Sequence, residues 1–296
     1  MSRFATLLHR EWMQHHRGYL VLAVAPPVLL LIVLAFSQSA IQIHPSLPPA
    51  VMAMSIGAVT AIVLAVGWIA MAFQMPGLAR RDQQDRSIEF WLSLPVGHAP
   101  AIGATLLFHA LLMPLMALAI GWAFSHVVGL VLVAMVGGAS AWLQLPWGVL
   151  LADGVVLMLR LALGITLATL WVSPVIGVLM VASAGLKRWG LPAVIALSVV
   201  FGAVIRQIFG VTNIVGNTVR DIGQHALFAL VPFTHGEVRV GEDGSGLPEL
   251  LAAFPRLAGE SALAALRDLA TADFLGVMAV SAACFAALVA LRRRNG

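Results

Sequence analysis

The residues best suited to chemistry near the start of the chain form the run His-Arg-Glu-Trp-Met-Gln-His at 9–15. This run partly matches the zinc motif His-Glu-x-x-His, in which two histidines four residues apart share one helical face. Here His9 and Glu11 are not adjacent, and His9 and His15 are six residues apart. We therefore expect no bound metal, and we expect His15 and His16 to contact lipid headgroups or water.

The sequence also lacks the residues that nucleotide binding and hydrolysis require. The GxxxxGK[ST] loop needs a lysine that reaches the terminal phosphates, and the only lysine, Lys187, follows Ala-Gly-Leu instead. The Gly-Ser-Gly run at 244–246 is shorter than the Gly-x-Ser-x-Gly of a nucleophile elbow and indicates a turn. Asp153 stands at the edge of an apolar run without a second aspartate nearby. We therefore expect that this chain is not itself an enzyme and holds no cofactor.

Four polar side chains inside apolar runs are candidates for lining a transport path. They are His109, Arg160, Arg206 and Gln207. A charged group in hydrocarbon is costly, so its presence suggests a function. Each also has a structural alternative, which the sequence leaves open. His109 can form a hydrogen bond between helices, Arg160 can extend to the outer interface, and the last two can anchor a helix end.

The composition is that of a polytopic membrane protein. Of 296 residues, 60% are hydrophobic and 10% are charged, whereas soluble domains carry about 25% charged residues. The formal charge of +4 comes from basic residues dispersed at the ends of apolar runs, which favours membrane orientation over nucleic-acid binding. The single cysteine, Cys284, excludes a disulfide within the chain.

The apolar runs predict an all-α fold with six transmembrane helices, since each run is long enough for the about 20 residues that a crossing needs. A proline at the first turn opens the third, and tryptophans at 142 and 147 place an outer turn at 137–148. The predicted spans are 18–36, 51–74, 101–124 or 101–136, 155–185, 190–210 and 272–291.

Two further segments flank or interrupt these spans. Residues 1–17 predict an amphipathic helix in the membrane interface, which either anchors the chain or braces a partner. Its apolar face carries Phe4, Leu7, Leu8, Trp12 and His15, and its arginines recur every seven residues. Residues 211–271 predict a small helical outer domain, with short amphipathic pieces around 247–254 and 257–270.

The charge distribution orients this layout. Segments predicted to be inside hold eleven of the 17 basic residues, and the first two outer loops hold none. The 211–271 segment carries four basic residues against seven acidic ones. The positive-inside rule therefore places both termini, including the tail at 292–296, in the cytoplasm. The expected membrane is a bacterial inner membrane.

The dense block of charge at 80–95 lies in the inner loop between the second and third predicted spans. Asp82 and Arg86 are four residues apart, which supports a short helix, and Pro95 is a stop signal. Ile88, Trp91 and Leu92 fall on one face of that helix. Such a segment suits binding to another protein, although a basic loop held inside by topology is the simpler alternative.

The run DRSIEFWLSLPV at 85–96 resembles the signature that follows the second span in permease subunits of type-2 ABC exporters, and the six-span layout fits that family over the whole chain. The resemblance implies a coupling helix that docks on a separate ATPase subunit. It assigns that role to Arg86, Ser87, Ile88, Glu89, Phe90, Trp91, Leu92, Ser93, Leu94 and Pro95. A weaker second contact is expected in the next inner loop, at Lys187, Arg188 and Trp189.

The same resemblance implies the rest of the assembly. A second permease chain is expected, as a homodimer with a heterodimer left open, together with two ATPase subunits that hold ATP and Mg²⁺. The apolar spans suggest an amphipathic or apolar substrate: a drug, a peptide or a lipid. The 211–271 segment would act as an exit gate, and membrane lipids would surround the whole.

Two other classes of protein remain as alternatives. A secondary transporter would carry ionisable residues at mid-membrane and broken helices in matching halves. The predicted spans lack mid-membrane acids, and the sequence shows no internal repeat. A membrane scaffold that only anchors partners needs no motif and stays open.

Overall fold

The computed structural model describes residues 3–37, 48–79, 97–210, 214–231 and 246–294. Every regular element in these ranges is a helix, so the all-α class is confirmed for this part of the chain. The elements are α1 Arg3–Phe36, α2 Pro48–Leu78, α5 His98–Leu107, η1 Phe108–Leu112, α6 Met113–Gly137, η2 Ala139–Gln144, α7 Trp147–Leu186, η3 Lys187–Trp189, α8 Gly190–Phe209, α9 Ile214–Leu230, α10 Leu247–Asp268 and α11 Ala272–Arg294.

Five helical stretches in the described residues are long and apolar enough to cross a membrane, so the chain is a multi-pass membrane protein. They are Arg3–Phe36, Pro48–Leu78, His98–Gly137, Trp147–Phe209 and Ala272–Arg294. The fourth stretch holds both α7 and α8, joined through η3. A sixth crossing therefore depends on whether this stretch passes the membrane twice, and it stays a prediction.

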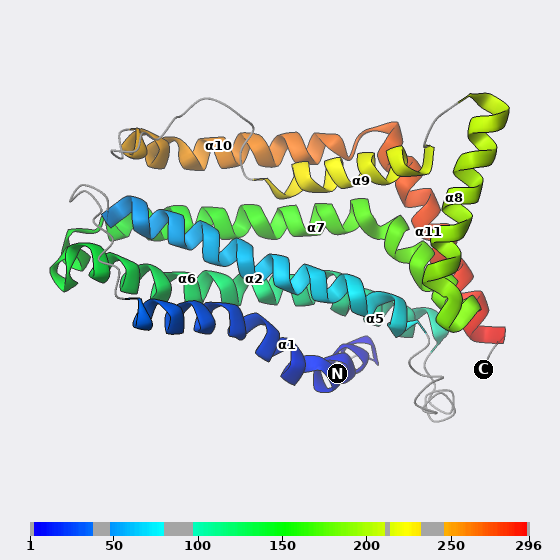
Figure 1. Cartoon of the computed structure of the whole chain (residues 1–296), viewed down its shortest axis with the longest axis horizontal. Coiled ribbons are helices and arrows are strands. Elements are labelled where there is room, and N and C mark those ends of the chain that lie inside the picture. Colours follow the sequence, from blue (N-terminus) through cyan, green and yellow to red (C-terminus); the bar gives the residue numbers. More distant parts are fainter. Residues whose placement is uncertain (1–2, 38–47, 80–96, 211–213, 232–245, 295–296) are drawn as a thin grey trace.

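The helices are layered on either side of α7 (Figure 1). α2 and α6 pack closely against each other on one side of α7, and α1 covers both of them. α9 and α10 run along the opposite side of α7, while α8 stands at a steep angle to the long helices. α11 contacts both α7 and α5, so the C-terminal end of the chain lies near the start of the third stretch.

The N-terminal amphipathic helix and the first span form one helix, α1. Its apolar face was predicted to lie in lipid, but much of that face packs on protein. Leu7 is buried, and Leu8 and Trp12 contact the core cluster built around Tyr19 and Phe108. A hydrophobic face records burial without identifying what covers it, so the interfacial location of this helix stays a prediction.

The third stretch is continuous from His98 to Gly137, which supports the longer of its two predicted forms. A π-helical turn, Phe108–Leu112, interrupts it just before Pro114. Proline has no N–H to donate to the carbonyl of Ala110, and Thr169 on α7 donates to that oxygen instead, at 2.9 Å. The proline thus sets the place where the helix widens and where α7 attaches to it.

A turn joins α6 to α7 within the predicted range 137–148, while its outer location stays a prediction. Gly138, with a φ of 73°, ends α6 in a conformation that glycine adopts without strain. Two indole N–H groups then fasten the turn, since Trp142 donates to Leu130 O and Trp147 donates to Trp142 O, each at 2.9 Å. The helix that follows begins at Trp147, eight residues before the predicted start of the fourth span.

The described part of the 211–271 segment is helical, as predicted, but its second half differs in detail. The two short pieces expected around 247–254 and 257–270 form one helix, α10, which continues through Pro255. Both α9 and α10 contact α7 along its length. The outer location of this segment stays a prediction.

Candidate functional site

The predicted ATPase-docking segment, Arg86 through Pro95, lies outside the described residues, so its role stays a prediction. The predicted second contact is described. Lys187, Arg188 and Trp189 are exposed on η3, at the turn between α7 and α8. The guanidinium of Arg188 lies 5.7 Å from the centre of the Trp189 ring, a cation–π arrangement at the surface. This basic and aromatic turn is accessible to a partner.

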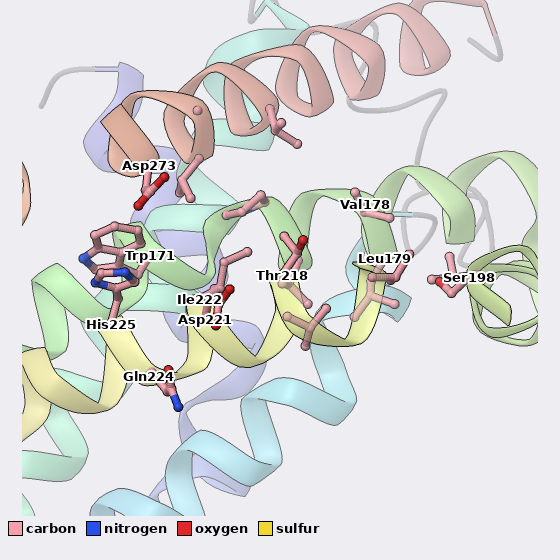
Figure 2. Close-up of a pocket in the computed structure, with 18 of the residues that line it drawn as sticks. Trp171, Val178, Leu179, Ser198, Thr218, Asp221, Ile222, Gln224, His225 and Asp273 are labelled. Carbon is pink, nitrogen blue, oxygen red and sulfur yellow. The ribbon is translucent and has the colours of Figure 1, made fainter. Parts of the chain in front are cut away.

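A cavity of about 710 Å³ opens between α7, α8, α9 and α11 (Figure 2). Its walls are mainly aliphatic: Pro174, Val175, Val178, Leu179, Val194, Val215, Val219, Ile222, Val277 and Val280. A volume of this size accommodates a drug-sized molecule, and apolar walls are typical of small-molecule sites.

One end of this cavity is aromatic and polar. The rings of Trp171 and His225 stack with centroids 4.1 Å apart and planes 8° apart, and Figure 2 shows Asp273 on the facing helix. Asp268 lies 2.8 Å from Nδ1 of His225, so Nδ1 carries the proton that the carboxylate accepts. The tryptophan and the carboxylate together hold the imidazole in one orientation.

Two further acids, Asp221 and Asp273, line the same cavity from α9 and α11. Both are exposed, whereas the aliphatic walls extend away from them toward α8. An amphipathic molecule with a cationic group fits a cavity with an acidic end and aliphatic walls. Its apolar part would contact the walls, and its positive charge would face the two acids.

A second, smaller cavity of about 410 Å³ lies between α2, α7 and α10. Its lining is apolar except for Asp153, whose Oδ2 is buried and has no hydrogen-bond partner within the described ranges.

Arg160 was predicted either to line a transport path or to extend to the outer interface, and both roles stay predictions. In the structure it does not belong to the lining of the large cavity, and its side chain is 3% exposed. Its bonds reach Ala229 O at 2.8 Å, Val231 O at 3.0 Å and Ser261 Oγ at 2.9 Å. The guanidinium fork therefore fastens the end of α9 and the middle of α10 to α7.

The other path candidates also lie away from the large cavity. Arg206 and Gln207 are exposed near the end of α8 and do not belong to the cavity lining. His109 is fully buried on the π-turn, where its Nε2 lies 3.4 Å from Oε2 of Glu11. The predicted helix–helix hydrogen bond of His109 is thus present, with a partner on α1.

The cluster around Glu11 was missed by the sequence analysis. Glu11 is fully buried, and its Oε1 accepts hydrogen bonds from Arg10 and, at 3.0 Å, from Thr105. His15 approaches Oε2 of the same carboxylate, with Nδ1 at 3.9 Å. The sequence feature that could have revealed this cluster is the four-residue spacing of Glu11 and His15, which puts both side chains on one face of the helix. His15 was expected to contact lipid headgroups or water, but it is half-buried beside this carboxylate.

Comparison with protein-family models, curated proteins and solved structures finds no match.

The cavity gives a direct prediction about binding. Replacing Val280 with tryptophan would fill space at its α11 wall, so binding of a rhodamine dye, an amphipathic cation, to the purified chain should weaken about tenfold or more. Val204→Trp is the matched control, because Val204 is equally exposed, at 47%, but lies on α8 outside the lining. Equal dye affinities of the two variants would show that the dye binds elsewhere.

Proposed function

We propose that this chain is the membrane-spanning permease subunit of a type-2 ABC exporter, which moves an amphipathic or apolar substrate outward. The observation that carries the proposal is the run DRSIEFWLSLPV, which resembles the coupling segment of that family. Its position supports the same proposal, because it connects α2 to α5, the second and third of the long apolar stretches.

The proposed topology has six crossings, with both termini in the cytoplasm of a bacterial inner membrane. In this arrangement α7 and α8 cross separately, and η3 lies on the same side as residues 85–96. Lys187, Arg188 and Trp189 then supplement the coupling segment as a second contact with the ATPase. The concentration of basic residues in the inner segments supports this orientation.

The proposed complex contains two permease chains, as a homodimer, and two ATPase subunits that bind ATP and Mg²⁺. The absence of a phosphate-binding loop from the sequence is the reason for placing nucleotide on a partner. Closure of the partner's nucleotide sites would displace residues 85–95 and, through them, the adjoining ends of α2 and α5.

The substrate would occupy the cavity between α7, α8, α9 and α11, whose apolar walls and acidic end suit an amphipathic molecule. The attachment of α9 and α10 to α7 through Arg160 makes this helix pair a candidate gate on the exit side. A drug, a peptide or a lipid all fit this description, and a cationic group would favour binding.

The experiment that tests the proposal is co-purification of the tagged chain with its ATPase from native membranes. Glu89→Arg reverses a charge in the docking segment, so ATP hydrolysis in the eluate should fall about tenfold or more while membrane insertion is unchanged. Glu249→Arg, an exposed charge reversal on α10, is the matched control and should retain the ATPase. Retention of the ATPase by Glu89→Arg would count against the coupling role.

Transport separates this proposal from a secondary transporter. In vesicles supplied with ATP, export should continue after ionophores dissipate the ion gradients. If export stops with the gradient while ATP is held constant, the secondary-transporter alternative is correct.

A further inference from the structure

We propose that Glu11, His15 and His109 bind one divalent transition-metal ion, with Zn²⁺ as the expected occupant. Glu11 and His15 come from α1, and His109 comes from the π-turn η1 of the third stretch. One ligand atom from each residue lies within 4.8 Å of the others. The proposal stands on this geometry and does not depend on the exporter assignment.

The distances between the ligand atoms are close to those that a metal ion requires. Two ligands of a tetrahedral Zn²⁺ ion, each about 2.0–2.1 Å from the metal, lie about 3.4 Å apart. Oε2 of Glu11 and Nε2 of His109 are 3.4 Å apart, and Oε2 of Glu11 and Nδ1 of His15 are 3.9 Å apart. Nδ1 of His15 also donates to the main-chain O of Glu11, at 3.1 Å, so the His15 ring has to rotate and give up this bond to complete the set.

The carboxylate is held in the orientation that a metal ligand needs. Arg10 and Thr105 both donate to Oε1, so Oε2 is the oxygen that faces the two imidazoles. Outer hydrogen bonds of this kind fix ligating groups in metal sites. The positive charge of Arg10 opposes a second cation, but its bond to Oε1 leaves Oε2 to coordinate the ion through a single oxygen.

His109 occupies a position that favours ligand binding. It is fully buried, and its Nε2 faces Oε2 of Glu11 at 3.4 Å. π-turns cost helix stability and occur frequently at functional sites. The His15 ring meets the His109 ring edge-on, with centroids 4.6 Å apart, which brings both imidazoles to the same carboxylate.

A cavity reaches one of the three proposed ligands, His15. A cavity of about 500 Å³ adjoins the cluster and is lined by His15, Gln14, Gln74 and Tyr19 among others. Water in this cavity would reach an ion at His15, which matches zinc sites that combine three protein ligands with one water. The ion would thereby connect the N-terminal helix to the third stretch.

This inference departs from the expectation that the chain binds no metal. That expectation compared His9 with His15, but His9 is exposed and the structure brings His109 to His15 instead. Two ligands four residues apart on one helix, completed by a distant histidine, form a different pattern from His-Glu-x-x-His.

The test is metal binding by the purified full-length chain without a histidine tag. After chelation and dialysis against Zn²⁺, we expect one ion per chain, and Co²⁺ should give the visible absorption of a site with nitrogen and oxygen ligands. His109→Ala and Glu11→Gln should each weaken Zn²⁺ binding by more than about 100-fold, and Thr105→Val should weaken it by about 10- to 100-fold.

Two controls separate this site from adventitious binding. His9→Ala removes a neighbouring exposed histidine, and His126→Ala removes one beside Trp122 on α6; both should bind Zn²⁺ like the original chain. If His109→Ala fails to fold, the Co²⁺ spectrum and stoichiometry of the original chain still decide. Less than one ion per chain, or equal losses in His9→Ala and His109→Ala, would overturn the proposal.

Discussion

Replacing Arg160 with leucine is expected to release α9 and α10 from α7 and to lower the melting temperature of the chain markedly. The substitution removes the donors to Ala229 O and Val231 O, at the end of α9. The last carbonyls of a helix have no partner within it, so Arg160 acts as a cap for α9 from a neighbouring helix. A buried acceptor left without a donor costs about 1–3 kcal/mol. Ala229 O loses its Arg160 donor, whereas Val231 O keeps a longer bond from the Ser261 hydroxyl, at 3.3 Å.

Two milder variants separate the contributions within this network. Arg160→Lys keeps the charge but loses the planar fork that reaches several acceptors, so it should be intermediate. Ser261→Ala removes the hydroxyl that accepts from the guanidinium at 2.9 Å and donates to Val231 O at 3.3 Å. It leaves both bonds from Arg160 to the carbonyls of Ala229 and Val231, so it should have the smallest effect. Thermal unfolding in detergent, followed by tryptophan fluorescence, gives the melting temperatures of the three variants. Limited proteolysis should cleave α9 and α10 more readily in Arg160→Leu than in the original chain. Equal melting temperatures for Arg160→Leu and Ser261→Ala would show that the α9 cap contributes little.

The positions of several helices and of the turn after α6 could be predicted from the sequence, because hydropathy and helix-stop signals depend only on nearby residues. The predicted second, fifth and sixth spans lie within α2, α8 and α11, with ends that differ by a few residues. The turn after α6 followed from Gly138 and the tryptophans around it. Each of these features depends on neighbours within a few residues, which is what a single sequence displays.

The contacts between distant helices could not be predicted in the same way. Arg160 meets acceptors about 70 and 101 residues further along the chain, and His109 meets Glu11 98 residues earlier. The sequence indicated that both side chains needed partners, since neither is stable alone in an apolar environment. It did not identify those partners, because periodicity gives the buried face of a helix but not the helix that covers it.

Replacing Gly164 with alanine is expected to destabilise the chain through the same α7–α9 contact. A Cβ atom at this position would lie 2.5 Å from Ala229 O and 3.2 Å from the Cα of Leu230. Both are backbone atoms, so α9 itself would have to move, and the displaced carbonyl is one that Arg160 binds. We expect a loss of about 1–3 kcal/mol, typical of overpacking in a well-packed interior.

Gly185→Ala provides a control of opposite sign on the same helix. Gly185 is exposed in the last turn of α7, and no atom lies within 4 Å of its added Cβ. Alanine favours a helix over glycine by up to about 1 kcal/mol, so this variant should melt at the same temperature or higher. Helix propensity alone would stabilise both Gly164→Ala and Gly185→Ala. Close packing lowers the melting temperature of Gly164→Ala but not that of Gly185→Ala. If both glycine variants were stabilised, α9 would be free to move away from α7. The attachment of α9 and α10 to α7 through Arg160 would then be weak as well.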